Sequence, residues 1–206
     1  MITICVGIRN RTDNLLKYLI ESMNQCEKKD QIGLSVFDCH SNDVPNLEEI
    51  IEEAWNGHLT YTNSNDKFTR SSAINGAVNQ SPSERIFLCD ADMSLPKDFV
   101  DQHNLHVTIH QVWFPICFSL NQGAKKEIKK ENGFWRHQGH GMVGIMRSKY
   151  FFLGSLSEKF KKWGGEDNDF FTRCRRKLKV VRENCQGLYH NWHSLDDAFK
   201  NKFYQT

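Results

Sequence analysis

Three carboxylates and one amide stand in consecutive positions late in the chain, directly behind an aromatic residue and two glycines. The segment reads Trp163-Gly164-Gly165-Glu166-Asp167-Asn168-Asp169. Glycines permit a tight turn and the close approach of a ligand, because they carry no side chain. Carboxylates beside a flat indole suit a polyhydroxylated molecule, although catalysis would need partners elsewhere in the chain. An acidic first turn that only caps its own helix would look the same, so this segment alone leaves both interpretations open.

Two aspartates, Asp90 and Asp92, follow an apolar segment that we expect to be a strand, residues 86–89. Extended backbone points alternate residues to the same side, so the two carboxylates should lie together. Paired carboxylates at the end of a strand can hold a hard divalent cation beside a diphosphate. Aspartates that only shape a loop can have the same spacing, and the motif is weak when it stands alone.

A pair of histidines, His190 and His193, lies three positions apart near the C-terminus. Imidazole is a frequent ligand of transition metals. Together with Asp92 the pair would form a mixed nitrogen and oxygen site, which favours Mn²⁺ over Ca²⁺ and leaves Mg²⁺ as an alternative. The competing interpretation is that these are ordinary surface or packed histidines, since the chain contains nine.

Charged residues also follow the first two expected strands. Arg9 and Arg11 come after the first, where guanidinium groups could grip a diphosphate through paired hydrogen bonds. Asp38 ends the second, where its carboxylate could accept the N3–H of a uracil base. The alternatives are a charged loop ahead of a helix for the arginines and ordinary turn chemistry for the aspartate.

Apolar runs alternate with helical patterns over the first half of the chain, which predicts an α/β fold with a mainly parallel central sheet flanked by helices. Ligands of such sheets bind beyond the carboxyl ends of the strands, where Arg9, Asp38 and Asp90 are expected. The first expected helix is capped by Thr12 or Asp13, and the others begin at residues 47, 70 and 166. The expected strands are residues 2–8, 34–37, 59–62, 85–89, 112–118, 142–146, 179–182 and 187–190.

One domain is expected to span residues 1–206, with a nucleotide-binding half over about residues 1–95 and an acceptor half over about 96–206. Basic and acidic residues number 27 and 25, and this near balance gives no reason to expect nucleic acid as a partner. The composition says nothing about the oligomeric state.

The seven cysteines form no CxxC pair, and several stand in apolar runs, which is typical of proteins from a reducing compartment. Met1 leads directly into an expected strand, so we expect no signal peptide. No window approaches the roughly 18 apolar residues of a membrane span, so none is expected. We therefore predict a cytoplasmic protein.

Taken in order, these segments resemble the inverting, metal-dependent glycosyltransferases of the GT-A fold. The likeness is greatest to the β-1,4-galactosyltransferases and the chondroitin-type N-acetylgalactosaminyltransferases, and it runs from about residue 4 to 193. It implies transfer of a hexose or N-acetylhexosamine from a UDP-sugar donor to a hydroxyl of a saccharide or glycoconjugate acceptor. The motifs that carry it are Arg9-Asn10-Arg11, Phe68-Thr69-Arg70, Asp90-Ala91-Asp92 and the segment from Trp163 to Asp169.

The resemblance also implies a role for each matching residue. Asp92 and His193 would ligate the metal, with His190 as a further ligand. Asp90 would lie near the ribose or a water, and Asp167 would be the catalytic base. The residues implied to contact UDP are Arg9, Arg11, Phe68 and Arg70. Those implied to contact sugar, or to set the base, are Trp163, Gly164, Gly165, Glu166, Asn168 and Asp169.

The chain departs from the family pattern at Asn168, where a third acidic residue is usual, and any lid would fall to residues 121–141. Two other classes of protein stay open. A noncatalytic module that binds a nucleotide-sugar or a carbohydrate would not need Asp167. A nucleotidyltransferase of similar fold would need a glycine-rich phosphate loop near the N-terminus, and Val6-Gly7-Ile8 offers a single glycine.

Overall fold

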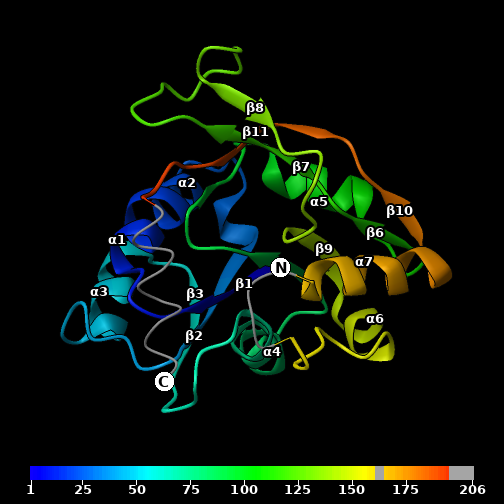
Figure 1. The fold of residues 1–206 in the computed structure, drawn as a ribbon. Coiled ribbons are helices and arrows are strands. Elements are labelled where there is room, and N and C mark those ends of the chain that lie inside the picture. Colours follow the sequence, from blue (N-terminus) through cyan, green and yellow to red (C-terminus); the bar gives the residue numbers. More distant parts are fainter. Residues whose placement is uncertain (161–164, 195–206) are drawn as a thin grey trace.

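A seven-stranded, mainly parallel sheet forms the centre of the protein (Figure 1). The computed structural model describes residues 1–160 and 165–194. The strands are β1 (Ile2–Ile8), β2 (Ile32–Asp38), β3 (His58–Asn63), β4 (Arg85–Cys89), β6 (Gln111–Trp113), β9 (Val143–Met146) and β10 (Lys179–Val181). Their order is β10-β6-β9-β4-β1-β2-β3, and β9 alone among them runs antiparallel to its neighbours. The predicted α/β fold with a mainly parallel sheet is confirmed.

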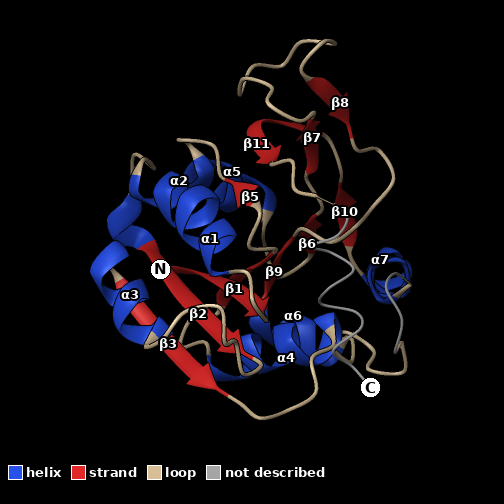
Figure 2. Ribbon diagram, turned by 60° about the vertical axis from the view of Figure 1, so that its left-hand side comes forward, coloured by secondary structure: helices blue, strands red, loops and turns tan. Residues whose placement is uncertain are grey.

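Helices cover both faces of this sheet (Figure 2). One face carries α1 (Thr12–Asn14), the π-helical turn η1 (Leu15–Ile20), α2 (Glu21–Asn24), α3 (Leu47–Ala54) and α5 (Phe99–His106). The other face carries α4 (Arg70–Gln80), α6 (Arg147–Phe152) and α7 (Glu166–Lys177). A short 3₁₀ turn, η2 (Lys29–Gln31), precedes β2.

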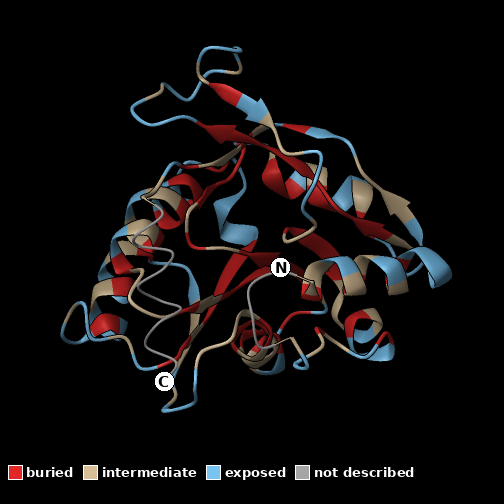
Figure 3. Cartoon of the chain, in the orientation of Figure 1, coloured by how far each residue is buried: buried red, intermediate tan, exposed pale blue. Residues whose placement is uncertain are grey.

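The strands β1 and β2 are buried along most of their length (Figure 3). Alternation of side chains along the buried strands builds a separate core on each face of the sheet. On β1, Ile4 and Val6 pack with the helices of the first face, whereas Cys5 packs with those of the second. All three side chains are fully buried. Buried apolar residues on both faces are typical of a parallel sheet covered by helices, and this explains why β1 is apolar except at Thr3.

The start of the first helix differs from the prediction that Thr12 or Asp13 would cap it. The N-cap position is Arg11, and its side chain makes no capping hydrogen bond. Asp43, from the segment after β2, accepts instead: its Oδ2 is 3.0 Å from the Thr12 N–H nitrogen and its Oδ1 is 3.0 Å from Thr12 Oγ1. The carboxylate therefore satisfies the helix start from a distant part of the chain.

A second, smaller sheet stands beside the first and has the order β5-β11-β7-β8. Its strands are β5 (Met93–Ser94), β7 (Ile116–Leu120), β8 (Gly133–Trp135) and β11 (Asn184–His190). The prediction of one strand over residues 112–118 is wrong, because the chain leaves the first sheet after β6 and enters the second at β7. Pro115 lies at the junction, where a residue without an N–H cannot continue the hydrogen-bond ladder.

Three further elements, β5, α5 and α6, were not predicted, and β8 lies within residues 121–141, the segment to which any lid was expected to fall. No helix among the described residues is long and apolar enough to cross a membrane. The seven cysteines are all free and buried. The single-domain organisation and the cytoplasmic location stay predictions.

Candidate metal and transfer site

The metal candidates come together because the second sheet pairs β11 with β5. His190 is opposite Met93 in this antiparallel pair, and Met93 directly follows Asp92. Asn191 fixes the pairing further: its N–H and its Nδ2 both donate to the carbonyl oxygen of Asp92, at 2.9 and 2.8 Å. Asn191 Nδ2 also donates to Ser94 Oγ at 2.9 Å. Residues that lie 97 and 99 positions apart in the chain thus become neighbours at the carboxyl end of β4.

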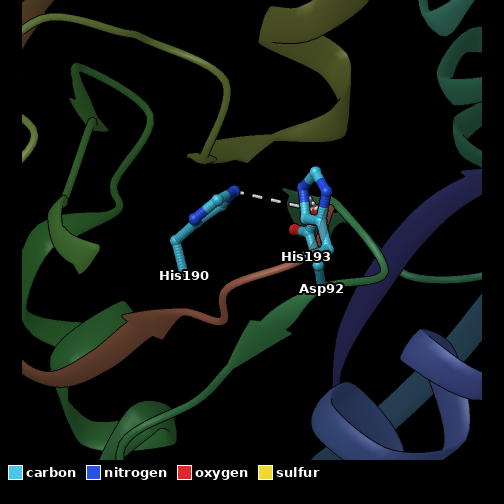
Figure 4. A group of neighbouring side chains, drawn as sticks. All are labelled: Asp92, His190 and His193. Atoms are coloured by element: carbon cyan, nitrogen blue, oxygen red, sulfur yellow. Dashed lines mark ion pairs between the residues drawn. The ribbon is translucent and has the colours of Figure 1, made fainter. Parts of the chain in front are cut away.

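Figure 4 shows both imidazoles facing the carboxylate of Asp92. Asp92 Oδ2 is 3.2 Å from His193 Nε2 and 3.8 Å from His190 Nε2. One ligand atom from each of the three residues can be chosen so that all lie within 4.8 Å of one another. This arrangement of one oxygen and two nitrogens fits a small divalent transition metal.

The state of these side chains also fits a metal. Asp92 Oδ1 is buried and has no hydrogen-bond partner among the described residues, so it is available as a ligand atom. Burial raises the pKa of Asp92, but the hydrogen bond from His193 and the charges of His190, His193 and Arg11 outweigh it and lower the pKa. His190 Nδ1 lies 3.1 Å from Ser119 Oγ, a contact that orients the ring so that Nε2 faces Asp92.

Asn191 supports a prediction about metal affinity. Replacing Asn191 with alanine removes both side-chain hydrogen bonds that hold Asp92 and Ser94 in place. Because groups that orient metal ligands are typically worth 10–100-fold in affinity, we expect Asn191→Ala to weaken Mn²⁺ binding by about tenfold. Calorimetric titration with Mn²⁺ measures this, with the exposed Asn104→Ala as the matched control. Equal affinity in both variants would show that Asn191 does not support the site.

Arg70, the first residue of α4, links the Asp90–Asp92 segment to the start of α7. Its Nε donates to Asp90 Oδ1 at 2.8 Å, and its Nη2 donates to the carbonyl oxygen of Gly141 at 2.9 Å. Nη1 lies 3.8 Å from Glu166 Oε1, and Glu166 is buried. Burial disfavours the charge on Arg70, but Asp90 and Glu166 outweigh it and raise the arginine pKa. The guanidinium therefore joins three segments that are distant in sequence.

We expect Arg70→Met to lower the free energy of unfolding by about 2–4 kcal/mol. Removing one partner of a buried ion pair leaves the remaining charge without compensation, and here Glu166 is buried while Asp90 is partly exposed. Urea unfolding of Arg70→Met, compared with the exposed Arg176→Met on α7, measures the difference. Equal stability of the two variants would show that the arginine is not needed to hold these segments together.

Asp167 lies in the first turn of α7, which begins after Gly165 with φ +100°. A Cβ at Gly165 would lie 2.8 Å from the Phe160 ring, so both the backbone angle and the space favour glycine. Asp167 Oδ2 accepts the backbone N–H of His140 at 3.1 Å, and Oδ1 accepts that of Asn168 at 2.8 Å. Burial raises the pKa of Asp167, but these donors and the charge of Arg70 outweigh it, so the pKa lies below its ordinary value.

The two neighbouring carboxylates, those of Glu166 and Asp169, are each paired with an arginine. Glu166 is paired with Arg70, and burial raises its pKa. Asp169 Oδ2 accepts from Nε and Nη2 of Arg173, at 2.9 and 2.6 Å, one helical turn further along α7. Asp167 is the one whose oxygens meet backbone N–H groups rather than a paired basic side chain. An ionised carboxylate held in this way can accept a proton.

The predicted nucleotide residues lie around the ends of β1 and β2. Asp38 is fully buried, and its oxygens accept hydrogen bonds from Ser41 and from the Tyr61 hydroxyl, the latter at 2.9 Å. Arg9, Arg11 and Phe68 are half-buried, and their nucleotide contacts stay predictions, as does that of Asp38.

The charge of Arg11 lowers the pKa of Asp92, which places this arginine near the metal candidates. Trp163 and Gly164 lie outside the described residues, so the sugar contacts expected of them stay predictions. The contacts expected of Gly165, Glu166, Asn168 and Asp169 likewise stay predictions.

Four residues of this region were not predicted from the sequence: Ser119, His140, Gly141 and Asn191. Asn191 stands between the two histidines, so its position was the strongest signal of a supporting role. His140 and Gly141 come from the segment that follows β8, and nothing in their local pattern points to α7. Their contacts depend on how the second sheet returns the chain to the first.

This α/β sheet, with a candidate metal cluster and nearby carboxylates at the carboxyl ends of its strands, has the arrangement expected of a GT-A glycosyltransferase. The chain belongs to the chondroitin N-acetylgalactosaminyltransferase family, whose sequence pattern matches residues 2–201. The predicted likeness to a chondroitin-type GT-A glycosyltransferase is thereby confirmed.

Chondroitin sulfate N-acetylgalactosaminyltransferase 1 from Homo sapiens is 26% identical over 216 residues, covering 94% of this chain and 41% of that protein. Chondroitin sulfate N-acetylgalactosaminyltransferase 2 from Homo sapiens is 28% identical over 216 residues, covering 94% of this chain and 40% of that protein. The chain therefore spans about two fifths of the length of these relatives.

Solved structures of glycosyltransferases share the fold. S. aureus TarS 1-349 in complex with UDP-GlcNAc matches with a TM-score of 0.67 at 16% identity, covering 94% of this chain and 59% of that one. The mannosyltransferase PcManGT from Pyrobaculum calidifontis, in complex with GDP-Man and Mn²⁺, matches with a TM-score of 0.68 at 13% identity, covering 91% of this chain and 56% of PcManGT. At these identities the likeness concerns the fold.

Proposed function

We propose that the protein is a metal-dependent, inverting glycosyltransferase that moves a sugar from a UDP-sugar to a hydroxyl of a saccharide acceptor. N-acetylgalactosamine is the first candidate sugar and a chondroitin-type saccharide the first candidate acceptor, because the relatives of the chain are named for them. The observation that carries the proposal is the cluster of Asp92, His190 and His193, with the buried oxygen of Asp92 free to bind a cation.

Asp92, His190 and His193 would hold Mn²⁺, which when bound supplies positive charge to the diphosphate of the donor. Mg²⁺ is the alternative ion. Arg9 and Arg11 lie in the loop after β1, where their guanidinium groups would bind the diphosphate and stabilise the negative charge that grows on departing UDP. Donors that are already fixed around the leaving group stabilise its growing charge without having to move during the reaction. This lowers the activation barrier for transfer.

Asp167 would act as the base in one displacement. Its carboxylate accepts the proton of the acceptor hydroxyl while that oxygen attacks the anomeric carbon from the face opposite UDP. The new carbon–oxygen bond forms as the bond to the diphosphate breaks, and the electron pair of the broken bond leaves with UDP. An α-linked donor thus gives a β-linked product. Because the pKa of Asp167 is low, proton transfer should accompany attack rather than precede it.

A panel of UDP-sugars tests the proposal. The protein is incubated with each donor and Mn²⁺, with and without chondroitin oligosaccharides or other saccharides, and UDP release is followed. We expect release that depends on both the metal and an acceptor. A noncatalytic binding module would bind a UDP-sugar without releasing UDP. A nucleotidyltransferase would instead form pyrophosphate from a nucleoside triphosphate and a sugar phosphate.

A further inference from the structure

His140, in the segment between β8 and β9, contacts the start of α7. Its backbone N–H donates to Asp167 Oδ2 at 3.1 Å, and its Nδ1 lies 2.6 Å from Asn168 Oδ1. Asn168 in turn donates its own backbone N–H to Asp167 Oδ1 at 2.8 Å. Each carboxylate oxygen of Asp167 therefore accepts one backbone N–H, and the two donor residues, His140 and Asn168, also contact each other.

Aromatic contacts and an arginine hold His140 in this position. Its ring is stacked on Phe171, with 3.9 Å between ring centroids and 23° between planes. Phe171 follows Asp167 by four residues on α7, so the same face of the helix carries both. Arg182 Nη2 donates to the carbonyl oxygens of His137 and Gly139, at 2.6 and 3.0 Å. The approach of this segment to α7 is thus determined from two sides.

The contact with Asn168 determines which nitrogen of the His140 ring carries the hydrogen. An amide oxygen accepts hydrogen bonds, so Nδ1 of His140 carries the hydrogen in its contact with Asn168. Burial lowers the pKa of His140, which favours the neutral imidazole with its hydrogen on Nδ1. An aspartate at position 168 would favour a charged imidazole instead. The uncharged amide of Asn168 is therefore a suitable hydrogen-bond partner for a neutral His140.

We propose that His140 is a positioning residue for the base Asp167, and that Asn168 is the partner through which its side chain acts. The inference rests on the proposed function, since it concerns the same base. Asp167 is only half-buried, so its carboxylate could otherwise turn toward solvent. The two N–H donors keep it in one orientation, and a misplacement of about 1 Å at a reacting group can cost about 100-fold in rate.

Three substitutions at His140 separate its hydrogen bond from its packing. His140→Asn places an amide N–H near the position of Nδ1, His140→Phe keeps a ring on Phe171 without that donor, and His140→Ala removes both. All three retain the backbone N–H. We expect kcat for transfer to fall by about 10–100-fold in His140→Ala and His140→Phe, and by less than about fivefold in His140→Asn. The affinity for UDP with Mn²⁺ should change by less than about twofold in each.

A double-mutant cycle with Asn168 tests the proposed route. If the side chain of His140 acts through Asn168, the combined His140→Ala and Asn168→Ala variant should be no slower than the slower single variant. Effects on kcat that multiply would overturn the inference. So would a His140→Phe variant with the wild-type kcat, which would show that the donor is not needed.

Gln138→Ala, an exposed residue of the same segment, is the control for a general disturbance and should keep the wild-type kcat. Failure of the proposed function is a separate result, because the unaltered protein would then release no UDP from any donor. Full transfer by the unaltered protein and by His140→Ala would overturn the positioning role alone.

Discussion

Replacing Asp167 with asparagine is expected to lower the rate of sugar transfer by about a thousandfold, within the range of about 10²–10⁴ that a general base contributes. Asparagine fills the same space and keeps an oxygen for one backbone N–H, but it cannot take the proton of an acceptor hydroxyl. UDP binding should change by less than about threefold, because the proposed role puts Asp167 at the acceptor hydroxyl rather than at the nucleotide. Initial rates of transfer and calorimetric UDP binding measure the two effects.

Asp101→Asn is the matched control for Asp167→Asn. Asp101 is an exposed aspartate of α5 whose ion pair with Lys28 is also exposed, so its loss should leave both transfer and folding nearly unchanged. Transfer by Asp167→Asn within about tenfold of the wild-type rate would contradict the assignment, since an enzyme that has lost its general base should lose more. Glu166 and Asp169 would then be the next candidates.

Asp92→Ala is expected to remove Mn²⁺-dependent UDP binding and to reduce transfer to background. The substitution takes away the one carboxylate of the cluster and leaves two imidazoles, which cannot complete the site. UDP titrations with Mn²⁺ and with excess chelator separate metal-dependent from metal-independent binding. His190→Ala and His193→Ala, which each leave two of the three ligands, should weaken Mn²⁺ binding less than Asp92→Ala.

Two results would contradict the metal assignment. To separate loss of the metal from loss of the fold, the urea unfolding curve of Asp92→Ala is compared with that of the wild type measured without metal. A folded variant that still binds UDP more tightly in Mn²⁺ than in chelator would show that the ion lies elsewhere. Transfer by the wild type in excess chelator would show that no metal is needed.

Most of the first sheet could be predicted, because its strands other than β6 are encoded locally. Residues 2–8 form a nearly continuous apolar run, interrupted by Thr3, and parallel strands buried on both faces have that pattern. The second sheet could not be predicted in the same way. Met93–Ser94 is too short to show any periodicity, and Pro115 divides an apolar run whose two halves join different sheets.

At the candidate site, too, the residue types could be read from the sequence, whereas the contacts between them depend on the fold. The residue types of Asp92, His190 and His193 indicated a metal site, but their proximity depends on the pairing of β5 with β11. The contacts of Arg70 with Gly141 and of His140 with Asp167 also join segments that no sequence pattern connects. The sequence therefore indicated which chemistry each group could perform, and the fold determined which of the groups meet.

The central claim is that a metal-dependent, inverting displacement takes place at the site formed by Asp92, His190, His193 and Asp167. Proton NMR of the product tests it most directly, using α-linked UDP-N-acetylgalactosamine and a chondroitin oligosaccharide with either Mn²⁺ or excess chelator. The proposal predicts a β-linked product with Mn²⁺ and no product with chelator. An α-linked product, or equal amounts of product under both conditions, would contradict it.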